Sequence, residues 1–176
     1  MNKAPALVLL LGVALSAVGD LRLYASQWDR WGPLGPEDEV PRFLATGVDN
    51  DDLSNRDLLG KVTVMTFWAS WCGPCGQEMP AIDAIARSYD SARVHVVGVN
   101  RDREGDIEQI VRNYRETRKL GFDMVLDSGG VGQAFRVSLI PHLVIVDAKG
   151  RIRFVHQGRT SENTLRGEID GLLAEG

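Results

Sequence analysis

The sequence is poor in the residues that build metal sites and structural cross-links. It has only two cysteines and three histidines among 176 residues, and a second CxxC pair is absent, which excludes a four-cysteine zinc site. Long basic runs are also absent. The 20 basic residues are outnumbered by 24 acidic ones, so nucleic acid is not an expected partner. There is no internal repeat, and a hydrophobic content of 44% with 25% charged residues is typical of one globular domain with an appendage.

That appendage is the amino-terminal segment "MNKAPALVLLLGVALSAVGD", which carries no charge from Ala4 to Gly19. At ~1.5 Å per residue this stretch is slightly shorter than a ~30 Å bilayer core. It fits a cleaved signal peptide, with a small-x-small site at residues 17–19, or an uncleaved signal-anchor extended to Tyr24. We favour the anchor. Since Lys3 stays inside, both interpretations place the main domain in the periplasm or outside the cell, and the anchor makes a single-pass protein of the inner or cytoplasmic membrane.

The rest of the chain is divided by composition and periodicity. Residues 1–24 are the signal-anchor or signal peptide, residues 25–41 are a linker rich in Pro, Gly and acids, and residues 42–176 are one domain. Apolar runs and helical spacing predict the following elements in that domain: a capping strand from Phe43, a turn or short helix near 54–58, strands at 61–70, 93–100 and 123–127, helices at 73–89, 104–119 and 131–135, a hairpin of strands 142–146 and 151–156, and a last helix capped by Thr160 or Ser161.

Both cysteines lie in "SWCGPCGQEMP", where a buried strand ends and a helix begins. A bridge between Cys72 and Cys75 closes a very short loop, so it is a poor structural staple. The first turn of a helix has unpaired N–H groups and a positive dipole end, which lower the pKa of a thiol placed there. Pro74 fits within that turn. We therefore predict a dithiol–disulfide couple in which Cys72 is exposed and attacks, while Cys75 is shielded.

A copper-binding metallochaperone is the alternative interpretation of the same residues. Cys72, Cys75 and His142 would supply its ligands, because His142 follows Pro141 and is expected to approach the cysteines. His95 and the remaining histidine, at position 156, lie in apolar strand runs and are expected to be ordinary sheet residues.

The segment "FWASWCGPC" resembles the active site of the thioredoxin superfamily. "GQEMP", the lead-in "LLGKV" and the amino-terminal segment resemble its TlpA/ResA/CcmG branch, which contains extracytoplasmic, usually membrane-tethered thiol–disulfide oxidoreductases. The resemblance covers residues 41–174, including an extra helix and strand (104–127) inserted before the second motif. It implies a thioredoxin-like α/β fold with a mixed central sheet and helices on both faces.

The second motif of the resemblance is "SLIPH". Pro141 matches the cis-proline of the family, which implies that the Ile140 backbone is presented to an extended substrate. Gly158 matches a glycine near the active-site groove. The residues implied in substrate binding are Trp71, Gly73, Pro74, Ile140 and Pro141, and Trp68 is expected to pack nearby.

Two positions depart from the thioredoxin pattern. Thr66 stands where thioredoxin has a buried aspartate, so a proton acceptor for Cys75 is missing there, and His142 stands where small hydroxyl residues are common. Glu78, about one helical turn after Cys75, is the candidate replacement, and the resemblance also carries a glutamate at this place.

The function predicted from these residues is reduction of protein disulfides by the Cys72/Cys75 couple, with no cofactor and with electrons from a membrane thiol protein. The resemblance implies apocytochrome c, or a related maturation partner, as a candidate substrate. The direction of electron flow is left open by the sequence.

Overall fold

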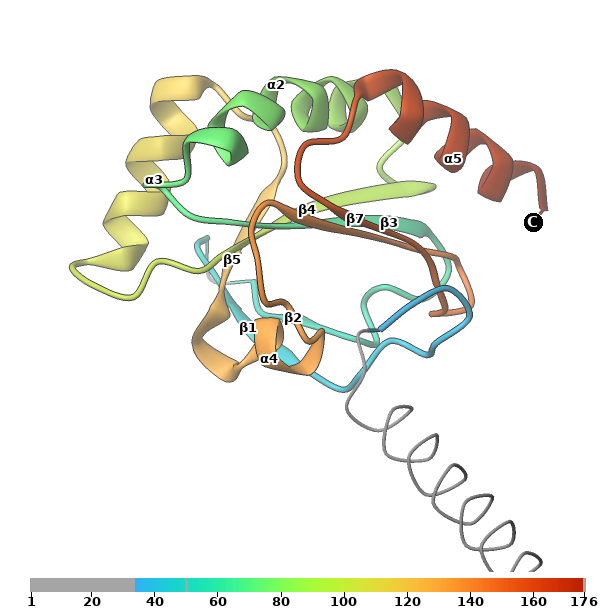
Figure 1. The fold of residues 1–176 in the computed structure, drawn as a ribbon, viewed down its shortest axis with the longest axis horizontal. Coiled ribbons are helices and arrows are strands. Elements are labelled where there is room, and N and C mark those ends of the chain that lie inside the picture. The colour runs from blue at the N-terminus through green and yellow to red at the C-terminus, as the bar shows by residue number, and fades with distance from the viewer. Residues whose placement is uncertain (1–33, 50, 176) are drawn as a thin grey trace, which may run out of the picture. The chain divides into compact units, whose positions relative to one another are not determined.

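The computed structural model describes residues 34–49 and 51–175, so the predicted signal-anchor lies outside the described residues. Within the described part of the chain, no helix is long and apolar enough to cross a membrane. Figure 1 shows the elements around a central sheet. In chain order they are β1 (Leu44–Gly47), β2 (Leu53–Ser54), β3 (Val62–Trp68), α2 (Gly73–Ser88), β4 (Val94–Asn100), α3 (Ile107–Arg118), β5 (Asp123–Leu126), the short 3-10 helix η1 (Asp127–Gly129), α4 (Val131–Ala134), β6 (His142–Val146), β7 (Ile152–Gln157) and α5 (Glu162–Glu175).

The seven strands form one mixed sheet in the order β2-β1-β5-β4-β3-β6-β7. β3 lies parallel to β4, and β4 lies parallel to β5, whereas the other pairs are antiparallel. All seven residues of β3 are buried, as expected for an apolar strand covered on both faces. The mixed sheet predicted from the sequence is confirmed.

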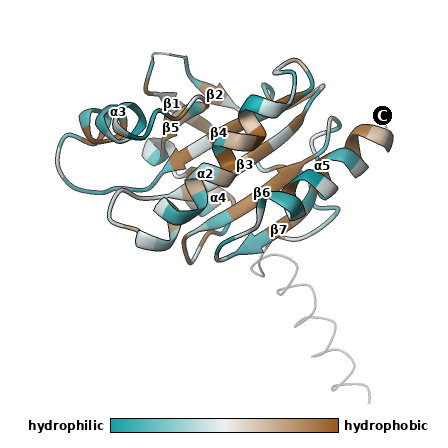
Figure 2. Cartoon of the chain, turned by 90° about the horizontal axis from the view of Figure 1, so that it is seen from above, coloured by the Kyte–Doolittle hydropathy of each residue, from teal (hydrophilic) through white to brown (hydrophobic). Residues whose placement is uncertain are grey.

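Helices cover both faces of this sheet (Figure 1). α2 and α5 lie over one face, and α2 buries Met79, Ile82 and Ile85 there. α4 lies on the other face, where Phe135 packs against Phe67 with ring centroids 5.4 Å apart. Figure 2 shows the hydrophobic residues concentrated in the central strands, while α3 is largely hydrophilic. Two hydrophobic clusters, one on each face, therefore hold the domain together.

The predicted helices and strands are present, with small boundary differences. β2 was not predicted, because two residues are too short a run to show periodicity. Ser161 is the cap of α5, since its Oγ accepts a hydrogen bond from the Thr164 N–H at 3.1 Å. The end of the predicted linker pairs with the β6–β7 hairpin: the Glu37 N–H donates to the Ile152 carbonyl at 2.7 Å.

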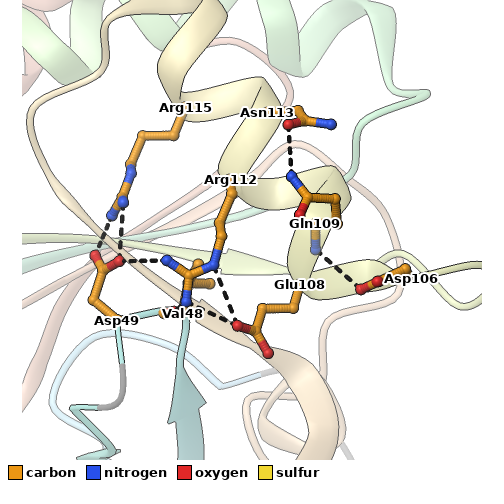
Figure 3. A network of polar contacts seen from close by, with 8 residues as sticks. All are labelled: Val48, Asp49, Asp106, Glu108, Gln109, Arg112, Asn113 and Arg115. Atoms are coloured by element: carbon orange, nitrogen blue, oxygen red, sulfur yellow. Dashed lines mark hydrogen bonds and ion pairs between the residues drawn. The ribbon is translucent and has the colours of Figure 1, made fainter.

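The inserted helix α3 is held to the end of β1 by ion pairs (Figure 3). Asp49 accepts from Arg112 at 3.0 Å and is also paired with Arg115, whose hydrogen bond lowers the pKa of the Asp49 carboxyl group. Arg112 is paired with Glu108 one turn earlier, at 2.8 Å. These contacts fix α3 so that its apolar side, including Tyr114, packs against the central cluster beside α2.

Candidate active site

The two cysteines lie at the junction of β3 and α2, as predicted. Cys72 is the N-cap of α2 and Pro74 is in its first turn. The structure contains a Cys72–Cys75 disulfide with the Cα atoms 5.3 Å apart. Cys72 Sγ accepts a hydrogen bond from the Cys75 N–H at 3.2 Å, and the Cys72 N–H donates to the Ala69 carbonyl at 3.1 Å. The start of the helix thus places an N–H donor on the sulfur expected to attack.

The exposure expected for Cys72 is not found in this disulfide state. Cys72 is 6% exposed and Cys75 1% exposed, so both are buried and the difference between them is small. Both cysteines belong to the hydrophobic cluster that also contains Met79 and Trp68. Cys72 is still the more accessible of the two cysteines.

The predicted substrate-binding residues fall into two segments, one following the end of β3 and the other preceding the start of β6. Trp71 is 71% exposed, and Gly73 and Pro74 are exposed beside it. The Ile140–Pro141 bond is cis, as predicted, although Pro141 itself is buried. Antiparallel pairing of β3 and β6 sets Phe67 opposite His142, which brings the proline segment to the end of β3 that leads into the Cys72 loop.

Gly158 lies beside the cis-proline, and Trp68 lies in the core below the cysteine loop. The Gly158 N–H donates to the Pro141 carbonyl at 2.9 Å, and its φ of 86° is one that favours glycine. Trp68 is fully buried and its ring centroid lies 4.4 Å from that of Tyr114. Trp68 is therefore part of the core beneath the cysteine loop.

Glu78 is in the interior of the domain, at 3% exposure. Its Oε1 accepts a hydrogen bond from the Thr160 N–H at 2.7 Å. Burial raises the pKa of the Glu78 carboxyl group, and the Thr160 hydrogen bond and the charges of His156 and Arg159 only partly oppose that effect. A solvated surface role for Glu78 is thereby excluded.

In this structure Cys72 and Cys75 are joined to each other, and the residues of the alternative copper site are not grouped as metal ligands. Across residues 34–49 and 51–175 there is no group of three or more His, Cys, Asp or Glu side chains that could hold a metal ion. His142 is buried with its ring 5.8 Å from that of Phe67, and burial, followed by the charge of Arg101, lowers its pKa. His95 and His156 are sheet residues, as predicted.

Sequence reasoning missed a buried carboxylate beneath the cysteine loop. Asp102 accepts hydrogen bonds from the Ser70 N–H and hydroxyl, both at 2.9 Å, and from the Asn100 amide at 2.7 Å. The Arg101 N–H also donates to the Trp68 carbonyl at 2.8 Å. The end of β4 therefore holds the segment that carries Cys72. Only the run of three polar residues "NRD", which begins at the end of an apolar strand, could have indicated this.

A family model for the AhpC/TSA family matches residues 36–155. The chain belongs to the AhpC/TSA family. This AhpC/TSA-family protein is 31% identical to the thioredoxin-like protein YneN of Bacillus subtilis (strain 168), over 75% of this chain and 77% of that protein. The sporulation thiol-disulfide oxidoreductase A of the same organism is 30% identical, over 70% and 75% of the two chains.

Solved structures of thiol–disulfide proteins are also similar to this AhpC/TSA-family chain. It is similar to a putative thiol:disulfide interchange protein DsbE from Chlorobium tepidum, with a TM-score of 0.72, 26% identity and coverage of 80% of this chain and 99% of that one. The predicted membership of the thioredoxin superfamily is confirmed. Together with the Cys72–Cys75 pair at a helix start, these likenesses identify a thiol–disulfide oxidoreductase.

Proposed function

We propose that this enzyme reduces disulfides of proteins outside the cytoplasm. The observation that carries the proposal is the hydrogen bond from the Cys75 N–H to Cys72 Sγ at the first turn of α2. The same N–H, with the dipole of the helix, stabilises a Cys72 thiolate once the disulfide is reduced. A stabilised thiolate in front of a second cysteine is what disulfide exchange requires.

In the reducing direction, the Cys72 thiolate attacks one sulfur of the substrate disulfide. A mixed disulfide forms, and the other substrate sulfur leaves as a thiolate and takes up a proton. The Cys75 thiol then loses its proton and attacks the Cys72 sulfur. This releases the second substrate thiolate, which also takes up a proton, and closes the Cys72–Cys75 disulfide. Two electrons pass to the substrate, and a membrane dithiol protein returns them to the cysteine pair.

The remaining roles are assigned from position. Glu78 accepts the Cys75 proton, because it is a buried carboxyl group one turn further along α2 and Thr66 cannot accept a proton at neutral pH. The Ile140 backbone pairs with an extended substrate segment, which Trp71 contacts. Apocytochrome c, or a related maturation partner, is the proposed substrate, on the resemblance to the TlpA/ResA/CcmG branch.

Trapping of the mixed disulfide tests this function. With Cys75→Ser, a disulfide substrate such as insulin is expected to accumulate as a stable adduct on Cys72, whereas Cys72→Ser should give none. Adducts trapped through Cys75 instead would contradict the order of attack. The same trap in cells, followed by identification of the captured protein, tests for an apocytochrome.

Direction and location need separate measurements. Titration against glutathione buffers should give a potential well below about −200 mV for a reductase, while a value near about −120 mV would indicate an oxidant. Fractionation of cells containing the full-length chain should place it in the membrane pellet. Recovery in the cytoplasmic fraction would contradict the proposed location.

A further inference from the structure

Two arginines lie against the turn of α2 that directly follows Cys75. From α3, Arg118 Nη2 is 3.6 Å from the position that a Cβ atom at Gly76 would occupy. From the segment between β7 and α5, Arg159 Nη1 donates to Gln77 Oε1 at 2.9 Å. Figure 1 shows α3 and α5 on either side of α2. We call Arg118 and Arg159 the cationic rim of the disulfide.

Neutral groups hold both arginines in place. The Arg118 guanidinium lies 4.2 Å over the ring of Tyr114, which is itself packed on Trp68, and Arg159 is bound to the amide of Gln77. Both arginine side chains are exposed. Each is therefore fixed in direction while its charge is left free to face solvent.

Carboxylates do not neutralise the cationic rim. Arg112 and Arg115 on α3 are paired with Asp49, but neither Arg118 nor Arg159 forms an ion pair with any residue that the structure describes. Arg159 does act electrostatically on one carboxyl group, because its charge lowers the pKa of Glu78 and so partly opposes the effect of burial. Because Glu78 is buried and bound to Thr160, it is not available on the surface.

The first turn of α2 contains no acidic residue, so the positive end of its dipole adds to the same field. The protein as a whole carries a net charge of −4, which would repel an acidic partner elsewhere on its surface. The positive charge at the turn of α2 that follows Cys75 thus contrasts with the net negative charge of the protein. Guanidinium groups bind carboxylates in a bidentate geometry and steer acidic partners toward a site.

We propose that the cationic rim selects disulfide substrates that carry Asp or Glu residues next to their cysteines. The inference rests on the proposed function and names the substrate class for the same site. Arg118 and Arg159 contact the substrate's acidic side chains while Cys72 attacks its disulfide. They are specificity residues and take no part in electron transfer.

Two synthetic peptides with the same internal disulfide test the proposal, one flanked by Asp and Glu and the other by Lys and Arg. For the full-length protein in low salt, we expect kcat/KM to be about tenfold higher for the acidic peptide. The ratio should fall toward one in 300 mM NaCl. Arg118→Gln with Arg159→Gln should also bring the ratio close to one, and the corresponding double Lys variant should retain most of it.

Arg93→Gln is the matched control, because Arg93 is also exposed but precedes β4 at the opposite end of β3 from the cysteines. It should leave the ratio unchanged. Hydroxyethyl disulfide, a small neutral substrate, reports on disulfide exchange itself. If the wild type does not reduce it, the proposed function is overturned. If it does, equal rates on the two peptides would overturn the cationic rim alone, as would a ratio that survives the double Gln substitution.

Discussion

Among single residues, Glu78 differs most from the usual glutamate, because the fold buries it. Thr66, at the place of the missing acid, is buried with a hydroxyl oxygen that has no hydrogen-bond partner among the described residues. Glu78 is buried as well, but one of its oxygens is bound by Thr160. A carboxyl group whose pKa is raised by burial can hold a proton at a pH where a surface carboxyl group is ionised.

Glu78→Gln should separate catalysis from stability. The raised pKa means that the folded state binds more protons than the unfolded state at pH values just above the ordinary 4.5, so stability falls as the pH rises through that window. The variant should lose this slope in urea unfolding and be at least as stable at neutral pH. Its mixed disulfide should resolve about tenfold or more slowly, with an altered pH profile. Unchanged turnover from about pH 5 to 9 would leave water as the proton acceptor.

At the scale of elements, the loop between β3 and α2 depends on the end of β4. Asp102 receives two hydrogen bonds from Ser70, two residues before Cys72, and Asn100 supports it from behind. Arg101 and Arg103, on either side of Asp102 in the chain, are paired with Asp127. Because these two arginines pair with Asp127, the Asp102 carboxylate is left to accept the hydrogen bonds of Ser70 in the cysteine loop.

Asp102→Ala removes the acceptor of three hydrogen bonds and should lower the free energy of unfolding by about 1–3 kcal/mol. It should also reduce kcat/KM for disulfide substrates, because Cys72 is no longer held in a fixed orientation. Asp102→Asn keeps an acceptor oxygen for Ser70 and should retain most of the activity. Urea unfolding and peptide reduction measure the two effects. Equal activity in the Ala variant and the wild type would show that the loop needs no support from β4.

The elements that sequence reasoning predicted well are those determined by neighbours along the chain. β3, the cysteines and α2 follow one another, so the apolar run "KVTVMTFW" and the helix start at Cys72 could be read directly. The hydrogen bonds of Ser70 to Asp102, and the approach of Arg118 to the backbone at Gly76, join segments far apart in the sequence. They depend on strand order and on the angle at which α3 packs, which hydrophobic periodicity does not contain. The burial of Cys72 was missed because it depends on how the start of α2 packs into the hydrophobic cluster of Met79 and Trp68.

At the scale of the whole molecule, the fold has to survive both states of its cysteine pair. One hydrophobic cluster packs α2 and α5 on one face of the sheet, and a second packs Phe67 and Phe135 on the other. The cysteines are two members of the first cluster, while β3, which contributes to both clusters, is buried along its whole length. The sheet therefore provides the stability, and the disulfide is free to open and close during turnover.

Reduction of the Cys72–Cys75 disulfide should accordingly lower the free energy of unfolding only modestly. A loop of four residues contributes about 2 kcal/mol in the chain-entropy treatment, against about 4.7 kcal/mol for a loop of 100 residues. Urea unfolding of the oxidised protein, of the reduced protein and of the Cys72→Ser/Cys75→Ser variant measures this difference. The reduced protein and the double variant should both remain folded at 25 °C, with similar midpoints below that of the oxidised protein. Unfolding on reduction would mean that the disulfide is a structural cross-link. The pair could not then act as a redox couple, because a redox couple must open in every catalytic cycle.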